Sequence, residues 1–341
     1  MVWFDESRLD DEVALGSADL RLRTLAESGA RVRREVGAAS DAIAEAVARS
    51  SDTRPRAVIA AGPDSRLLRA VLEPFCPVPF VAWPSPALPG WAGSLDLVVV
   101  LAPGGSDTGT ASAVAEAARR GCQLVVACPP GSMVAEHAAG RWTTILPTRT
   151  DDQLATAVAM LSFLHQVQVG PVADSEAVAN ALDQVAIACS PGRDISINPA
   201  KMLAISLADA NPLVWGGSVL GARAARRVAE SIRRTSGRTA LAGDAEHLLP
   251  VIEAARPRNV FADPFADGAG DRRPVLVVLD DGTEDPVAHD QRRRLDEAAR
   301  AGDVRVETVT ADVDGEVARY ASLLLHGTYA AEYLRLGLVD D

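Results

Sequence analysis

Glycine and hydroxyl residues gather where two apolar runs of the N-terminal half end. Residues 57–61 are followed by the turn 62–65 (Gly-Pro-Asp-Ser), and residues 95–102 are followed by 103–110 (Pro-Gly-Gly-Ser-Asp-Thr-Gly-Thr), which stands directly before a helical pattern. Free backbone amides at a helix start, with hydroxyls nearby, hold a phosphate without any basic side chain. The pattern therefore predicts a phosphate site made by Ser65, Gly105, Ser106, Thr108 and Thr110.

The second of these turns also has a simpler interpretation. Ser106 or Asp107 would cap the following helix through its side chain, and the glycines would only shape the turn. Asp107 counts against a bound phosphate, because a carboxylate beside a phosphate repels it. Both interpretations stay open from the sequence alone.

His247 is the histidine whose surroundings best suit proton transfer. It follows Glu246 at the start of an expected helix with Leu248, Val251 and Ile252 on its apolar face. An imidazole donates or accepts a proton near neutral pH. A partly exposed histidine at a helix start more often has no chemical role.

The sequence gives little evidence for a catalytic lysine, a metal site or a dinucleotide-binding site. Lys201 is the single lysine beside 33 arginines, and the four cysteines and five histidines show no CxxC, HxxxH or HExxH spacing, so we expect no metal. The acidic run 280–285 could hold a divalent ion, but it suits a solvated loop and helix cap better. No expected strand leads into Gly-x-Gly-x-x-Gly, so we expect no cofactor, and a nicotinamide-dependent enzyme is the weakest hypothesis.

Composition and charge narrow the class of protein. The 341 residues are 48% apolar and 23% charged, which is typical of soluble globular proteins with about two domains. A net charge of −12 argues against nucleic acid or anionic membrane as partner. The chain has no apolar window of about eighteen residues and no basic-then-apolar N-terminus, so we expect no membrane span, no secretory signal and a cytoplasmic location.

Short continuous apolar runs, typical of buried parallel strands, alternate with helical patterns. The expected strands are residues 57–61, 79–82, 95–102, 123–127, 144–146, 212–215, 274–279 and 304–309. The expected helices are residues 20–47, 65–72, 111–120, 222–234 and 323–336, with another ending at 299. The order strand, glycine turn, helix, strand, hydroxyl turn, helix recurs at an offset of roughly 155 to 180 residues.

This repeat predicts an α/β protein with two similar flavodoxin-like domains, each a parallel sheet with helices on both faces. We expect an N-terminal domain over residues 1–150, including the leading helices. A helical linker over 151–200 and a C-terminal domain over 201–341 would follow.

Residues 97–121 resemble the signature loop and helix of sugar isomerase (SIS) domains. In that family a strand ends in Ser-x-Ser-Gly-Asn-Thr-x-Glu-Thr, and a helix containing x-Ala-x-x-x-Ala-x-x-x-Gly follows. Gly105, Thr110 and Ser112 coincide with the family loop, and Ser106 stands at its asparagine. The match indicates a SIS-type domain in the N-terminal half.

Further motifs extend the resemblance along the chain. Residues 131–136 (Gly-Ser-Met-Val-Ala-Glu) resemble the family's Gly-Gly-Arg-Leu-Ala-Glu turn. Residues 216–221 resemble the opening turn of the second domain, which adds Ser218 to the expected phosphate ligands. His247 falls near the family's histidine after Pro-Glu-x-Asn-His. Taken whole, the chain resembles the small bifunctional phosphoglucose/phosphomannose isomerases.

That resemblance implies a phosphosugar partner, no metal or cofactor, and a homodimer. The implied reaction converts glucose 6-phosphate or mannose 6-phosphate to fructose 6-phosphate. His247 would open the sugar ring, and Glu230 or Glu246 would move the proton between C1 and C2. Residues 261–265 suit a surface turn or a dimer contact.

Several positions depart from the family pattern. In the loop, Ala102 and Gly104 replace serines, and Asp107 replaces the threonine. Met133 replaces an arginine, and Arg234 lies about where the catalytic base belongs. The family's C-terminal lysine has no counterpart before Asp341. Donors and charges of this kind typically contribute ~10²–10³ in rate. The alternative function is therefore a catalytically degenerate SIS protein that senses a sugar phosphate.

Overall fold

The computed structural model describes residues 3–50, 54–255 and 272–339. The segment 261–265, expected as a turn or dimer contact, lies outside the described residues. The chain divides into two compact units, Ser28–Asn180 and Met1–Glu27 with Ala181–Asp341, which we call the N-terminal and C-terminal units. The expected linker 151–200 is shared between these two units.

The N-terminal unit contains a five-stranded, all-parallel sheet in the order β3-β2-β4-β5-β6. Its strands are β2 (Val58–Ala61), β3 (Phe80–Trp83), β4 (Leu97–Leu101), β5 (Gln123–Cys128) and β6 (Thr143–Pro147). Every residue of β2 and β4 is buried, as expected for parallel strands covered on both faces.

Helices cover both faces of this sheet. One face carries α4 (Thr108–Arg119) and α5 (Met133–His137), which pack on the apolar side chains of β2, β4 and β5. The other face carries α2 (Ser28–Ser50), α3 (Ser65–Leu72) and α6 (Gln153–Gln166), and α6 contacts both α2 and α3.

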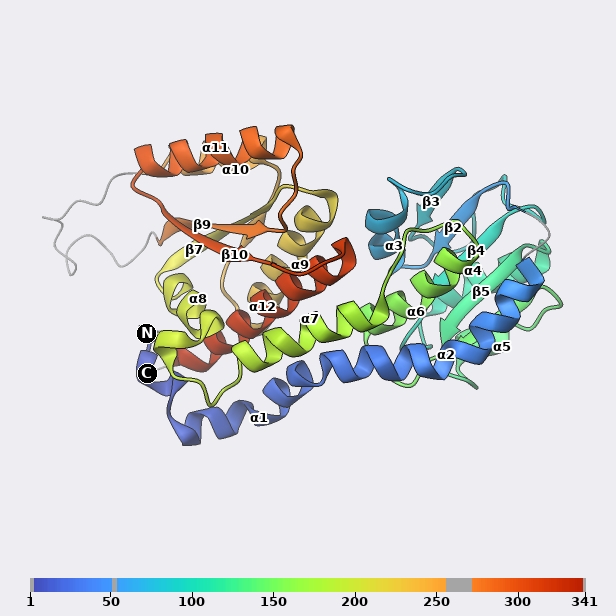
Figure 1. Ribbon diagram of the computed structural model, residues 1–341, viewed down its shortest axis with the longest axis horizontal. Coiled ribbons are helices and arrows are strands. Elements are labelled where there is room, and N and C mark those ends of the chain that lie inside the picture. The colour runs from blue at the N-terminus through green and yellow to red at the C-terminus, as the bar shows by residue number, and fades with distance from the viewer. Residues whose placement is uncertain (1–2, 51–53, 256–271, 340–341) are drawn as a thin grey trace, which may run out of the picture. The chain divides into compact units, whose positions relative to one another are not determined.

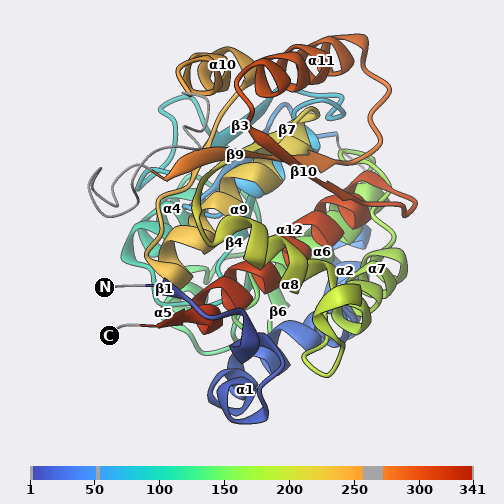
Figure 2. The same cartoon turned by 90° about the vertical axis from the view of Figure 1, so that its left-hand side faces the viewer.

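The C-terminal unit contains a four-stranded parallel sheet in the order β10-β9-β7-β8. Its strands are β7 (Ala210–Gly216), β8 (Leu241–Ala242), β9 (Arg273–Asp280) and β10 (Arg305–Thr310). One face is covered by α10 (Ala245–Glu253) and α11 (Pro286–Ala301). The opposite face is covered by α8 (Pro199–Leu207), α9 (Val219–Ser236) and α12 (Glu316–Gly337), as both views show (Figures 1 and 2).

The single lysine explains why the first residues belong to the C-terminal unit. Lys201 of α8 is fully buried, and its Nζ donates to Asp10 at 2.6 Å and to the carbonyl oxygens of Pro191 and Arg193 at 2.9 and 2.7 Å. These bonds satisfy the buried ammonium and tie the N-terminal segment to α8.

The N-terminal segment and the helices that join the two sheets complete the fold. The N-terminal segment begins with β1 (Trp3–Phe4), which pairs antiparallel with β11 (Leu338–Val339). The 3₁₀ turn η1 (Glu6–Leu9) and α1 (Glu12–Ala26) follow, and α7 (Ser175–Ala188) and η2 (Ile195–Ile197) lead into α8.

The two sheets share one topology, in which β2, β3, β4 and β5 correspond to β7, β8, β9 and β10. In each sheet the strand order reverses between the two central strands, β2 and β4 or β7 and β9. Ligands of such sheets bind at this switch point, beyond the carboxyl ends of the strands. The predicted α/β fold with two similar parallel-sheet domains is confirmed. None of the helices in the described part of the chain has the length and apolar character needed to cross a bilayer.

Candidate functional site

The start of α4, where the sequence predicts phosphate binding, is occupied by a carboxylate of the protein itself. Asp107 is the N-cap residue, and its Oδ1 accepts hydrogen bonds from the Thr110 amide and the Thr110 hydroxyl, both at 2.6 Å. A carboxylate at a helix N-terminus is stabilised by the free amides and the helix dipole. The structure therefore favours the capping interpretation of this loop.

The other expected phosphate ligands of this unit are not arranged alike. Ser106, in the loop before α4, and Thr108, the first residue of α4, are both exposed. Ser65, the first residue of α3, is 1% exposed, and its hydroxyl has no hydrogen-bond partner among the described residues. Only Ser106 and Thr108 thus present free surface to a ligand.

Two glycines let the loops of this edge pack closely. Gly105 has a φ of +64°, and a Cβ there would lie 2.7 Å from the hydroxyl oxygen of Ser132, the N-cap residue of α5. Gly62 has a φ of +88°, and its Cβ would lie 2.9 Å from the Thr110 hydroxyl oxygen. The loops after β2, β4 and β5 are therefore packed against one another.

The start of α9 in the C-terminal unit repeats the arrangement at α4. Ser218 is the N-cap residue; its hydroxyl accepts from the Gly221 amide at 2.8 Å and donates to Asp281 in a short hydrogen bond. Asp281 follows β9 and is 9% exposed. A carboxylate of the protein again lies at the helix start.

A cavity of about 260 Å³ lies at the switch point of the C-terminal sheet. Trp215 and Gly217 line it from the end of β7, residues 278–284 from β9 and its loop, and His289 and Arg292 from α11. The lining combines an indole ring, three carboxylates, an imidazole and a guanidinium. Carboxylates accept hydrogen bonds from hydroxyl groups, and an indole packs on apolar C–H groups, so this lining suits a polyhydroxylated ligand.

An ion pair between Asp280 and Arg292 keeps both of these cavity side chains charged. Asp280 pairs with Arg292 at 2.6 Å. Burial opposes ionisation of Asp280, but the Gly282 amide and the Arg292 guanidinium outweigh it and lower the pKa of the carboxyl group. The prediction of a solvated loop and helix cap is correct for Asp285, which caps α11, and wrong for the buried Asp281.

The residues predicted to transfer protons are not brought together. Glu230 lies on α9 and pairs with Arg227 at 2.7 Å, whereas exposed His247 lies on α10, across the sheet. Glu246 pairs with Arg294 of α11 at 2.6 Å, and hydrogen bonding from this guanidinium lowers its pKa. Because each candidate base is paired with an arginine, neither is placed to take a proton from a substrate carbon.

Residues 196–337 match the family model described as the bacterial phospho-glucose isomerase C-terminal SIS domain. This part of the chain is a SIS domain. Among solved structures, the whole chain is similar to tagatose-6-phosphate ketose/aldose isomerase from Escherichia coli, at 12% identity over 92% of each chain with a TM-score of 0.66.

A second similar structure is the C-terminal domain of glucosamine-fructose-6-phosphate aminotransferase from Francisella tularensis, at 11% identity. The match covers 93% of this chain and 96% of that chain, with a TM-score of 0.63. Identities this low show the fold alone. No curated protein sequence matches the chain.

Three residues that line the cavity are not among the site residues predicted from the sequence: Trp215, Asp281 and Arg292. Asp281 follows the strongest apolar strand of the second half directly, which places it at the carboxyl edge where ligands bind. That position is the signal that could have identified it. Nothing local marks Arg292, whose pairing with Asp280 spans a helical turn and a loop.

Proposed function

We propose that this protein binds a phosphosugar in the cavity at the switch point of its C-terminal sheet, as a sensor or regulator rather than an efficient isomerase. The observation that carries the proposal is the cavity itself. Trp215, Asp281 and Arg292 converge on it, within the unit that matches a phospho-glucose isomerase SIS domain.

Each part of the ligand has a complementary group. The carboxylate of Asp281 would accept hydrogen bonds from sugar hydroxyls, and the Trp215 indole would cover an apolar face of the ring. Arg292 would take the phosphate, exchanging its bond to Asp280 for a charge-assisted pair. A volume of about 260 Å³ lies just below the ~300–1,000 Å³ of drug-sized ligand sites, which suits a ligand as small as a hexose phosphate.

The loss of efficient catalysis is inferred from the groups that an isomerase needs. Moving a proton between C1 and C2 requires a positioned base within hydrogen-bond reach of the carbon acid. Glu230 and Glu246 are held by arginines, and half-buried Met133 stands at the family's arginine position without a charge to stabilise an enediolate.

A second candidate is retained because the matched family model describes an isomerase domain. In this alternative the protein converts glucose 6-phosphate or mannose 6-phosphate to fructose 6-phosphate. His247 would open the ring, and Glu246, once released from Arg294, would carry the proton between the two carbons.

One pair of measurements separates these functions. Glucose 6-phosphate, mannose 6-phosphate and fructose 6-phosphate are tested for thermal stabilisation of the protein, and then for turnover in a coupled assay at high protein concentration. We expect a rise in Tm without turnover, because ligand binding to the folded state alone stabilises it. Turnover supports the isomerase, and the absence of both effects overturns both functions.

Two matched arginine variants test whether the phosphosugar binds in this cavity. Arg292→Gln should abolish the rise in Tm, whereas Arg300→Gln, an exposed change of equal charge on the same helix, should keep it. Equal behaviour of the two variants contradicts the assignment of the cavity. The homodimer and the cytoplasmic location remain predictions, and light scattering that shows a monomer at micromolar concentration would count against the dimer.

A further inference from the structure

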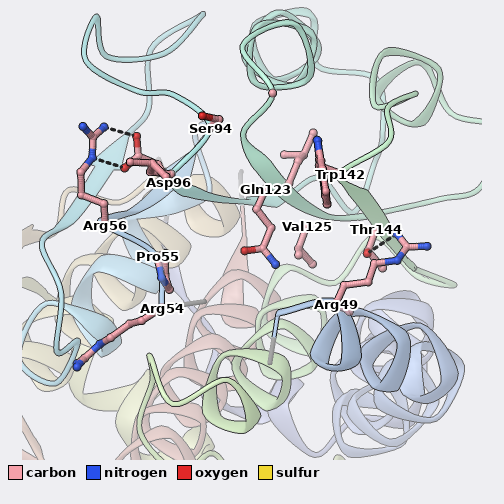
Figure 3. Close-up of a pocket in the computed structure, with 14 residues that line it drawn as sticks. Arg49, Arg54, Pro55, Arg56, Ser94, Asp96, Gln123, Val125, Trp142 and Thr144 are labelled. Carbon is pink, nitrogen blue, oxygen red and sulfur yellow. Dashed lines mark hydrogen bonds and ion pairs between the residues drawn. The ribbon is translucent and has the colours of Figure 1, made fainter. Parts of the chain in front are cut away.

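Two cavities of the molecule have walls of different kinds. The N-terminal unit has a cavity of about 430 Å³ at the amino edge of its sheet, where residues of β5 and β6 and the end of α2 line it (Figure 3). The ion pair between Arg56 and Asp96, at 2.6 Å, joins two side chains of that wall to each other. One wall of the C-terminal cavity is instead the loop 281–284 after β9. A loop needs support from outside the cavity, because it holds side chains less precisely than a strand does.

The bonds that this loop makes within itself are short-range. The Gly282 amide donates to the Asp280 carboxylate at 3.0 Å, and the Thr283 amide donates to the Asp281 carboxylate at 3.3 Å, so each bond joins residues two positions apart. The Ser218 hydroxyl also donates to the Asp281 carboxylate. These bonds orient the side chain of Asp281, but they do not fix the position of its backbone in the cavity wall.

Arg319, in the first turn of α12, supports that backbone from outside the cavity. Its Nη1 donates to the backbone carbonyl oxygen of Asp281 at 3.2 Å, and its Nε donates to the carbonyl oxygen of Val313 at 2.8 Å. Val313 lies in the loop after β10, so one guanidinium joins the loops that follow two neighbouring strands. Arg319 is half-buried and forms no ion pair with any residue that the structure describes. Its planar fork of donors suits two acceptors at fixed positions.

We propose that Arg319 is a positioning residue of the phosphosugar cavity, which holds the backbone of Asp281 so that its carboxylate faces the ligand. This inference rests on the proposed function, in which Asp281 accepts hydrogen bonds from sugar hydroxyls. Arg319 does not line the cavity, so it acts through the loop and not by touching the ligand. A loop that is held in place before the ligand arrives loses less conformational entropy on binding, and the affinity is higher.

Hydrogen–deuterium exchange of the full chain measures the hold on the loop without any ligand. In Arg319→Gln, the exchange rate of a peptide that contains the Gly282 and Thr283 amides should rise about tenfold, because a charge-assisted hydrogen bond to this loop is lost. A peptide from β7 should exchange as it does in the wild type. The matched control is Arg335→Gln, an exposed arginine in the last turn of α12, which should leave both peptides unchanged.

Two outcomes of the exchange experiment overturn the proposal. The first is an unchanged rate in the loop peptide of Arg319→Gln. The second is an equal rise in the loop peptide and in the β7 peptide, because it shows a loss of global stability and no specific hold on the loop.

Calorimetric titration with glucose 6-phosphate then measures the effect on binding. Arg319→Gln should raise the Kd about tenfold, since the loop must be ordered when the ligand binds. Arg319→Lys should raise it only about threefold, because an ammonium keeps the charge and bonds one carbonyl but does not span both. Arg335→Gln should leave the Kd unchanged.

An unchanged Kd in Arg319→Gln overturns the positioning role. Full recovery of the wild-type Kd in Arg319→Lys also overturns it, because the charge alone would then account for the effect. If the wild type binds no phosphosugar, the proposed function fails, whereas the exchange experiment still decides whether Arg319 holds the loop.

Discussion

The carboxyl edges of the two sheets share one topology but differ in what their loops leave open. In the N-terminal unit the loops pack on one another through Gly62 and Gly105. In the C-terminal unit the equivalent edge holds a cavity of about 260 Å³ lined by Trp215 and Arg292. Topology thus determines where a site can lie, whereas the size and charge of the loop side chains decide whether a ligand fits.

The two edges also share a feature that matters for phosphate binding. A carboxylate of the protein lies at each helix start, Asp107 at α4 and Asp281 at α9. In a phosphosugar enzyme these amides are available to a phosphate. Here the anion is internal, so the cationic group for a ligand must come from elsewhere, and Arg292 is the candidate.

The largest expected effect tests whether the N-terminal edge is closed. Gly105→Ala places a Cβ 2.7 Å from the Ser132 hydroxyl oxygen at a φ of +64°. The clash and the left-handed backbone together should lower the free energy of unfolding by about 3 kcal/mol, measured by urea denaturation. Gly104→Ala is the control, because nothing lies within 4 Å of its Cβ position. Equal stability of the two variants would show that the edge is loosely packed.

Acid should weaken the C-terminal unit through His326 on α12. Burial lowers the pKa of this imidazole from 6.5 to about 4, against a hydrogen bond with the Pro199 backbone that raises it. The unfolded chain then binds the proton more readily, so stability present above pH 6.5 is lost as the pH falls toward 4.

The expected loss is about 2 kcal/mol, after a discount for the partial exposure of the ring. It is read as the difference between wild type and His326→Gln in urea unfolding curves at several pH values. The glutamine variant lacks the titrating ring and should show a shallower pH slope. Identical slopes would show that His326 is not held neutral by its surroundings.

The strands and most helices could be predicted from local pattern. Continuous apolar runs predict the ends of β4 and β9 to within about two residues. The pattern predicts that α4 starts at residue 111, whereas the helix starts at Thr108, because the sequence leaves the cap made by Asp107 as one of two open interpretations. Strand β8 has two residues, which is too short for any periodicity to show.

The site was less predictable, because its chemistry depends on contacts between distant parts of the chain. Glu246 resembles a free base in sequence, but Arg294, 48 residues later, lies beside it on α11. Asp281 resembles a solvated carboxylate until the fold buries it against Ser218. Local pattern carries no information on either pairing.

A matched pair of substitutions compares the two helix starts directly. Asp281→Asn should raise the Kd for glucose 6-phosphate about tenfold, because it removes a charged acceptor from the cavity. Asp107→Asn should change this Kd less than about twofold, since asparagine also caps well and the loop lies in the other unit. Isothermal titration calorimetry measures both values. A larger effect at Asp107 would place the ligand at α4 instead.

The smallest expected effect concerns the cap itself. Asp107→Ala removes the acceptor for the Thr110 amide and hydroxyl, and it should lower the free energy of unfolding by about 1 kcal/mol. Asp107→Ser keeps an acceptor and should lose only a few tenths of that amount. Thermal unfolding checks that the serine variant is more stable than the alanine variant. A serine variant less stable than the alanine variant would contradict the capping role.

A crystal structure with glucose 6-phosphate tests the central claim most directly. The account predicts ligand density in the C-terminal cavity, with the ring beside Trp215, hydroxyls at Asp281 and the phosphate at Arg292. Density at the start of α4, beside Asp107, would contradict it. An empty cavity at a ligand concentration that raises Tm would contradict it equally.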